Sequence, residues 1–197
     1  MSGDTKTGRR RRLRAFAAAA AVAALVIGLV VFKPWLLFLD VRVDEQLPAV
    51  ATAGPTGPEP APSAPGASSP DTPAPAVPSG PVELAAGSLI SHEHTTTGTV
   101  RIIRQPDGSR VLTLENLDTS NGPDVHVWLS VADVVEGTAG WFTAGSAERY
   151  DLGLIKGNQG NQVYAVPGDA DLSKYKSVDL WCVQFSVSFG AAQLVPR

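Results

Sequence analysis

A long apolar run directly behind a basic N-terminus constrains this chain more than any other feature. Residues 1–14 hold six basic side chains against one acid, Asp4. Residues 15–32 then carry no charge, and these 18 residues are at the short end of what spans a bilayer as a helix. Bulky apolar side chains continue past Lys33 and Pro34 to Leu39. We therefore predict a basic cytoplasmic tail over residues 1–14 and a transmembrane anchor in the lipid bilayer over residues 15–39.

Positive charge ahead of a first span keeps that end of the chain in the cytoplasm. The pattern thus predicts a single-pass membrane protein whose C-terminal part is extracytoplasmic. The alternative is a cleaved signal peptide, which has an apolar region of about 7 to 15 residues with a cleavage site close behind. Here the run is longer, and the small residues Ala49-Val50-Ala51 follow too far downstream. Because no cysteine follows the run closely, lipoprotein attachment is excluded.

The composition changes over residues 43–81. Eleven of the 16 prolines lie between Pro48 and Pro81, among Ala, Gly, Ser and Thr. A segment with so few large side chains cannot bury enough surface to offset the entropy of ordering. Its proline content favours extended polyproline helix at about 3.1 Å per residue. We predict a disordered linker that spaces a domain away from the membrane.

The remaining residues, 82–197, are predicted to form one all-β domain, an antiparallel β-sandwich or a barrel-like fold. Short stretches with alternating apolar and polar side chains are separated by turn signals such as Pro106-Asp107-Gly108 and Pro167-Gly168-Asp169. We also expect a hairpin turn at Asn158–Asn161. The predicted strands are residues 88–92, 98–104, 110–116, 125–131, 150–155, 162–166 and 178–189. The domain holds 13 acidic and 8 basic residues, and the absence of a basic stripe argues against nucleic acid as a partner.

The only cysteine of the chain, Cys182, lies in the last predicted strand. Read as one strand, the segment places Trp181, Val183 and Phe185 on an apolar face and Cys182 on the opposite, more polar face. A structural cysteine usually behaves as a small buried hydrophobe. We therefore predict that Cys182 is accessible to redox chemistry, while an incidental thiol remains the alternative. With one cysteine, a dithiol cycle within the chain is excluded.

Six ordered segments of the domain resemble the DM-thirteen electron-transfer domain family. They include GSLISHEHTTTG from Gly87, GPDVHVWLS from Gly122 and LWCVQF from Leu180. The resemblance implies an extracytoplasmic all-β redox module. It also implies that Cys182 is the redox-active residue and that His94 is its companion. The sequence departs modestly at Leu89 and Trp128, where an aromatic residue and a tyrosine are common in the family.

A metal or haem site is a weaker hypothesis. Cys182, His94 and His126 supply the donor types of a two-histidine, one-cysteine copper site. No histidine follows the cysteine, however, and the only methionine is Met1. No motif supports haem, and the cofactor stays unknown.

Two functions of different classes remain. The first is a membrane-tethered redox or electron-transfer module that acts with a partner oxidoreductase, as an accessory module rather than a stand-alone enzyme. The second is a non-enzymatic β-sandwich that binds a surface protein or wall polymer, with an incidental cysteine. No nucleophile-elbow sequence or phosphate-binding glycine loop is present.

Overall fold

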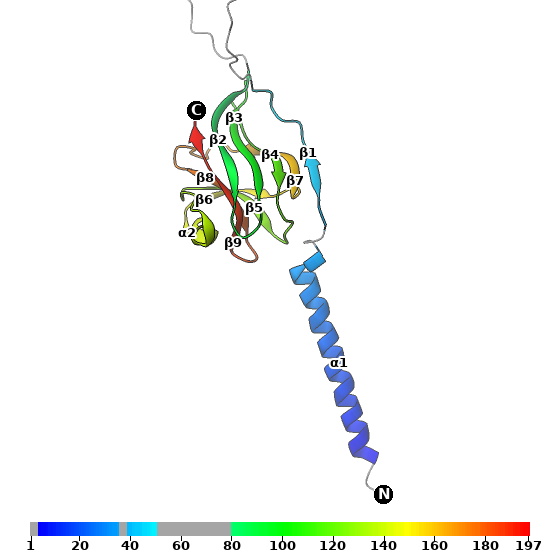
Figure 1. Cartoon of the computed structure of the whole chain (residues 1–197). Coiled ribbons are helices and arrows are strands. Elements are labelled where there is room, and N and C mark those ends of the chain that lie inside the picture. The colour runs from blue at the N-terminus through cyan, green and yellow to red at the C-terminus, as the bar shows by residue number, and fades with distance from the viewer. Residues whose placement is uncertain (1–3, 36–38, 51–79) are drawn as a thin grey trace, which may run out of the picture.

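The computed structural model describes residues 4–35, 39–50 and 80–197, with side chains from residue 14 onward. A long helix, α1 (Asp4–Phe32), extends from one end of a β domain (Figure 1). Most of the predicted linker, residues 51–79, lies outside the described residues, so its predicted disorder stays a prediction.

Helix α1 contains a segment, Arg14–Phe32, that is long and apolar enough to cross a membrane. None of that segment is buried against the rest of the chain. A signal sequence near an N-terminus has the same properties. The helix ends where Lys33 takes the left-handed conformation, at φ 43°, and donates its N–H to the Leu29 carbonyl, ahead of Pro34. A left-handed residue followed by proline is a common helix terminator.

The β domain is a single curled sheet of ten strands, so the predicted all-β class is confirmed. Neighbouring strands follow the order β1-β7-β4-β3-β2-β9-β8-β5-β6, and β10 pairs with β2. The strands are β1 (Arg42–Asp44), β2 (Val82–Ser91), β3 (Thr97–Arg104), β4 (Arg110–Asp118), β5 (Val125–Ser130), β6 (Arg149–Leu154), β7 (Gln159–Val166), β8 (Ser177–Cys182), β9 (Val187–Gln193) and β10 (Val195–Pro196).

Strand β2 curls the sheet because its two halves pair with different neighbours. Residues 82–88 pair with β3, whereas Leu89–Ser91 pair with β9. Near the two ends of the strand order, β7 is joined to the segment that follows β6 by hydrogen bonds that involve Tyr164 and Gln162. The Tyr164 hydroxyl lies 2.7 Å from Gln162 Oε1, and that oxygen accepts the Lys156 N–H at 2.8 Å. The result is a half-barrel, in line with the barrel-like prediction.

The concave interior of the half-barrel is apolar. Alternating residues of each long strand point inward, as the period-two pattern predicts. Phe189, Leu112, Leu114, Leu180 and Val127 are essentially inaccessible to solvent. Burying side chains of this size contributes about 1.5 to 3 kcal/mol each, so this interior is the main source of stability.

The outer face of β5 and β8 is also buried, because an excursion after β5 covers it. The 3-10 helix η2 (Gly137–Phe142) and the short helix α2 (Thr143–Ser146) lie there (Figure 1). Trp128 and Trp181 stack beneath them with ring centroids 5.1 Å apart. A Cβ at Gly145 would lie 2.5 Å from the Trp181 ring, so only glycine allows this close packing. For residues 131–150 the sequence allows a short helix or a long excursion, and the structure shows an excursion that contains short helical turns.

The prediction of one strand over residues 178–189 is wrong. Strands β8 and β9 are antiparallel, and Val183–Ser186 form a tight turn between them. Ser186 adopts φ 53°. The turn contains no Gly, Pro or Asn, so the usual turn signals are missing there. The turn reverses the chain, so the predicted apolar face does not exist as one surface.

Strand β1 adds an unpredicted element to the edge of the domain. It lies in the range assigned to the linker and runs parallel to β7, with Val43 opposite Gly160. The sheet is therefore mixed at this edge and antiparallel elsewhere. The predicted hairpin turn at Asn158–Asn161 is also wrong, because Gln159–Asn161 belong to β7 and pair with β1.

Candidate functional site

The thiol of Cys182 lies inside the half-barrel. Its side chain is 0% exposed, and it belongs to the same apolar cluster as Leu180, Val187 and Phe189. Val187 and Val125 are its partners on the two neighbouring strands. The predicted position on a polar face is wrong, because the inward face of β8 is the one that carries Leu180 and Cys182. As folded, the sulfur has no direct access to solvent.

Burial raises the pKa of the Cys182 thiol above its ordinary value. The backbone amides of Phe185, Gln184 and Asp124 act against this by lowering the pKa, but they do not offset burial. Only the thiolate is a nucleophile or a metal ligand. The resting thiol is therefore protonated and unreactive at neutral pH.

The cover over Cys182 is thin, because the cysteine is the last residue of β8. The four turn residues that follow, 183–186, are all exposed. One backbone hydrogen bond, from the Val183 N–H to the Asp124 carbonyl at 2.9 Å, fastens the start of the turn to the neighbouring strand end. Leu180, two residues earlier, is paired with β5 and β9 just as Cys182 is, but it is followed by further strand residues instead of a turn.

His94 lies in an apolar cavity on the same side of the domain. The cavity has a volume of about 410 Å³. The His94 ring packs against Phe189 in a tilted arrangement, with ring centroids 3.9 Å apart, and its Nε2 lies 2.6 Å from Glu93 Oε2. Burial lowers the pKa of His94, and the Glu93 carboxylate opposes this. The other lining residues are Gly122, Pro123, Trp141, Phe142, Phe185 and Val187.

The cavity and the thiol share a wall. Val187, which is the cross-strand partner of Cys182, lines the cavity. So does Phe185 in the turn that covers the sulfur. A Cβ at Gly122 would lie 2.7 Å from Val125 and 2.8 Å from Phe189, so glycine is needed to seal this wall. The structure thus places the predicted companion, His94, in the layer next to Cys182.

His126 is not part of this arrangement. It pairs with Trp181 across β5 and β8 and lies on the outer face, opposite the face that carries Cys182. Its Nδ1 is 2.9 Å from Asp151 and its Nε2 is 3.1 Å from Asp124. Burial lowers the pKa of His126, but the bonds to Asp151 and Asp124 outweigh it and raise the pKa overall.

The three donors of the hypothetical copper site are therefore not brought together. Within the part of the chain that the structure describes, no group of three His, Cys, Asp or Glu side chains is placed to hold a metal ion. The Asp124 carboxylate lies 3.1 Å from His126 Nε2, while the backbone of the same residue contacts the end of β8 near the cysteine.

The sequence reasoning missed a buried polar chain on the outer face of β8 and β9. Ser188 Oγ lies 2.7 Å from His92 Nδ1, and His92 Nε2 lies 3.1 Å from the Val135 carbonyl. Burial raises the pKa of Asp179 to about 7, and a hydrogen bond from Ser188 counteracts this. Asp179 Oδ1 and the indole N–H of Trp128, opposite it on β5, have no hydrogen-bond partner among the described residues. In the sequence, the only indication of these buried polar contacts is the set of polar residues between Val178 and Phe189.

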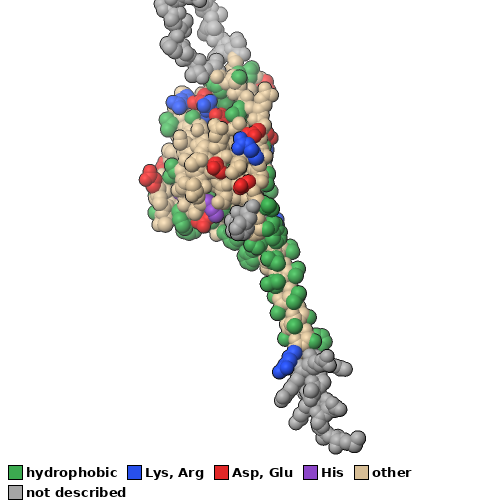
Figure 2. Space-filling model, turned by 45° about the vertical axis from the view of Figure 1, so that its right-hand side comes forward, with side chains coloured by type: hydrophobic (Ala, Val, Ile, Leu, Met, Phe, Trp, Pro, Cys, Tyr) green, Lys and Arg blue, Asp and Glu red, His purple; other side chains and the backbone are tan. Residues whose placement is uncertain are grey.

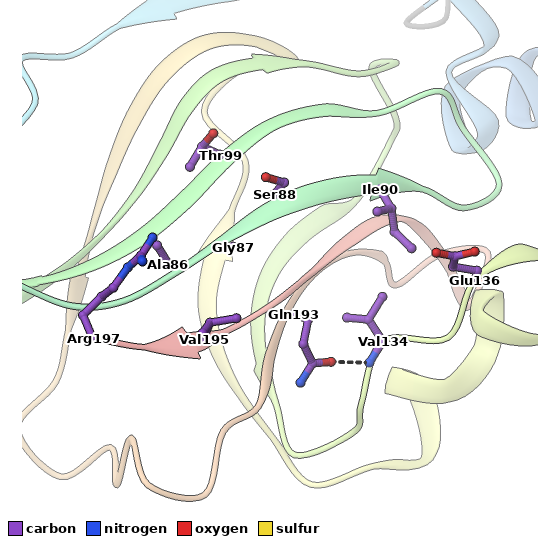
Figure 3. A pocket seen from close by; sticks show the side chains of 10 residues that line it. All are labelled: Ala86, Gly87, Ser88, Ile90, Thr99, Val134, Glu136, Gln193, Val195 and Arg197. Carbon is purple, nitrogen blue, oxygen red and sulfur yellow. Dashed lines mark hydrogen bonds between the residues drawn. The ribbon is translucent and has the colours of Figure 1, made fainter.

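A second hollow, a groove of about 510 Å³, lies along β2 near the point where this strand changes its pairing partner from β3 to β9 (Figure 3). Ser88 and Thr99 line it from β2 and β3, and Glu136 lines it from the excursion. The Gln193 side chain closes one end by accepting the Val134 N–H at 2.8 Å. None of the predicted site residues lies in this groove.

The domain thus combines an all-β half-barrel, a buried thiol and an apolar cavity that contains a histidine. A comparison with protein families matches residues 88–194 to the family described as Electron transfer DM13. The chain belongs to this family, which confirms the resemblance seen in the sequence. No curated protein and no solved structure matches the chain. The match makes the domain an electron-transfer-related module.

Proposed function

We propose that the chain is a membrane-tethered, extracytoplasmic redox module whose reactive centre is Cys182. Two features support the tether: the exposed apolar segment of α1 and the basic residues ahead of it. The exposed side chains of α1 suit a lipid environment, because a helix that is apolar all round needs a membrane or a buried core to cover it.

The observation that carries the redox proposal is the thin cover over Cys182. The sulfur lies under one exposed turn, and the amides of Phe185, Gln184 and Asp124 surround it. The same amides favour the thiolate, although burial and the charge of Asp124 outweigh them while the turn is closed.

The chemistry that follows is thiol–disulfide exchange with a partner oxidoreductase. When the turn opens, the thiol gives up its proton. The thiolate attacks one sulfur of a disulfide in the partner, that disulfide bond breaks, and the other sulfur leaves as a thiolate. The product is a mixed disulfide between Cys182 and the partner. His94, in the adjoining cavity, is the imidazole placed to accept the thiol proton once the turn has moved.

The test uses the full chain in detergent with glutathione disulfide as the model oxidant. Mass spectrometry follows formation of a mixed disulfide at neutral pH, and Cys182→Ser is the control that cannot react. We expect slow but complete modification of the folded protein. A His94→Gln variant should react more slowly at neutral pH, with the difference diminishing at high pH, where no base is needed.

A non-enzymatic binding module is the second candidate. The observation that favours it is the complete burial of Cys182 with a raised thiol pKa. A folded protein that resists modification for as long as it stays folded would favour this function over the redox module.

A further inference from the structure

The segment that follows the anchor is fastened to the domain by many contacts. The Val41 N–H donates to Asn158 Oδ1 at 2.7 Å, and Asn158 Nδ2 donates to Asp40 Oδ1 at 2.8 Å. The Glu45 carboxylate accepts the Val163 N–H at 2.6 Å and lies 2.7 Å from Lys156 Nζ. Adding a strand to an open sheet edge in this way is a known mode of peptide recognition.

The domain is shaped to receive this strand. Asn158 is completely buried and also donates to the Thr119 carbonyl at 2.8 Å, so it links β1 to the loop after β4. Cβ atoms at Gly157 and Gly160 would lie 2.3 Å from the Val41 carbonyl and 2.1 Å from the Val43 carbonyl. Gly160 also has φ 95°, which other residues rarely adopt. Both glycines thus leave room for the backbone of β1.

Docking of β1 brings the turn over Cys182 to the end of the anchor. Phe32 of α1 stacks on Phe185 with ring centroids 6.2 Å apart and nearly parallel planes. Gln184 Nε2 donates to the Val31 carbonyl at 3.0 Å. Hydrophobic side chains continue from α1 onto the adjoining edge of the domain (Figure 2).

We propose that the domain lies directly on the bilayer, with Val183, Phe185 and Phe142 in the interface of the leaflet from which α1 emerges. These side chains are 41%, 48% and 59% exposed and lie next to one another, since Phe142 lines one hollow with Phe185 and another with Val183. A contiguous exposed apolar patch of this kind marks an interaction surface. Phe185 touches the last helical residue of the span, so it lies at the depth where aromatic side chains favour the membrane interface. This inference rests on the membrane anchor of the proposed function.

Two consequences follow for the chain. The proline-rich segment leaves the domain after β1 and returns to it at β2, so it adds no distance between the domain and the membrane. The cavity that holds His94 is lined by Phe142 and Phe185, so its mouth faces the lipid surface. The domain is held at the bilayer and is not carried away from it.

Electron spin resonance on the full chain in phosphatidylcholine vesicles tests the proposal. In a Cys182→Ser background, one nitroxide is placed at Val183→Cys and another at Ser173→Cys. Ser173 lies in the loop ahead of β8, at the opposite end of that strand from the turn. We expect the label at position 183 to relax faster with oxygen, which concentrates in lipid, and the label at position 173 to relax faster with a water-soluble nickel chelate.

A proline pair tests the role of β1. Glu45→Pro removes the N–H that donates to the Asn161 carbonyl at 2.9 Å, and Ala49→Pro is the matched control beyond the strand. Neither residue belongs to the core, and near-ultraviolet circular dichroism of the Trp128–Trp181 pair reports folding. We expect Glu45→Pro to at least halve the oxygen effect at position 183 and Ala49→Pro to leave it unchanged.

The outcomes separate this inference from the proposed function. If both labels report water while the protein floats with the vesicles, the anchor stands and bilayer contact of the domain is refuted. Protection of position 183 from both reagents would mean that a protein surface covers the turn, which also refutes contact with lipid. A chain that does not float with vesicles would refute the anchor and this inference together. Thiol modification of Cys182 is measured separately in detergent and does not depend on these results.

Discussion

The two faces of β8 are equally buried but chemically different. The inward face presents Leu180 and Cys182 to an apolar core, and no ionisable residue belongs to that cluster of described side chains apart from the thiol and Tyr164. The outward face presents Asp179 and Trp181 to a layer that contains His92 and Ser188. Burial therefore does not distinguish a reactive group from an inert one. What differs is how thickly each group is covered and which hydrogen-bond partners it finds.

The inward face should be the more sensitive to loss of volume. Phe189→Ala removes a ring that is 2% exposed and also forms the wall of the His94 cavity. We expect a loss of about 3 to 5 kcal/mol in the free energy of unfolding, as for other buried aromatic residues. Phe185→Ala, in the exposed turn, should cost far less. Urea denaturation in detergent measures both, and equal losses would contradict the assigned core.

The outward face should govern the pH dependence of stability. The pKa of Asp179 is raised from its ordinary value of 3.8 to about 7 in the folded protein, so the folded state binds more protons between these values. Stability should then fall as pH rises from about 4 through 7. Asp179→Asn should remove that decline and stabilise the protein at pH 8 by about 1 to 3 kcal/mol, because the neutral amide does not have to ionise in the interior.

Denaturation of wild type and Asp179→Asn at several pH values measures this difference. His92, whose pKa is lowered by burial, contributes in the opposite direction, with stability lost as pH falls. The comparison of the two proteins isolates Asp179. Asp171→Asn is the control, because hydrogen bonds from Ser173 lower the pKa of that exposed carboxyl. A parallel decline in wild type and Asp179→Asn would contradict this account.

The thiol itself should behave as a small apolar side chain. Cys182→Ala should cost about 1 kcal/mol, close to the value for one buried methylene-sized group. Cys182→Ser should cost slightly more, because its hydroxyl needs a partner in the core. Thermal or urea denaturation measures both. A serine variant more stable than the wild type would contradict this expectation.

The smallest effect is expected at the edge strand. Hydrogen bonds from Lys156 and the Val163 amide lower the pKa of Glu45 below its ordinary value of 4.5. The stabilising contribution of this carboxylate is therefore present above that value and is lost as pH falls through the lowered pKa. The pair is partly exposed, so Glu45→Gln should cost under about 1 kcal/mol at pH 7. The difference between variant and wild type should diminish in acid in the same denaturation assay.

The sequence predicted the strands with marked alternation because one face of each is buried. Residues 98–104 and 110–116 are examples, and β3 and β4 match them closely. It failed at residues 178–189, where the turn lacks the usual turn residues and both faces of β8 are buried, so that no polar face indicated the outside. It also missed β1, because three residues next to a proline-rich segment form a strand only when a tertiary partner supplies the edge.

The candidate site was predictable in part. The family pattern predicts Cys182 and His94 as site residues, and their role stays a prediction; in the structure Cys182 pairs with Val187 and His94 contacts Phe189, both on β9. The orientation of the thiol depends on where β8 ends, which periodicity alone does not reveal. The Asp179–Ser188–His92 chain joins residues from separate parts of the sequence, and such a contact has no signature in one sequence.

The central claim is that the turn over Cys182 opens locally while the sheet stays folded. The most direct test measures the rate of thiol modification of the full chain in detergent at low urea concentrations. Ser186, which has φ 53°, offers a matched pair, since Ser186→Gly should relax the turn in its closed form and Ser186→Val should strain it. We predict a rate independent of urea in this range, severalfold slower in the glycine variant and severalfold faster in the valine variant. A rate that rises with urea and follows only the global free energy of unfolding in all three proteins would contradict the claim.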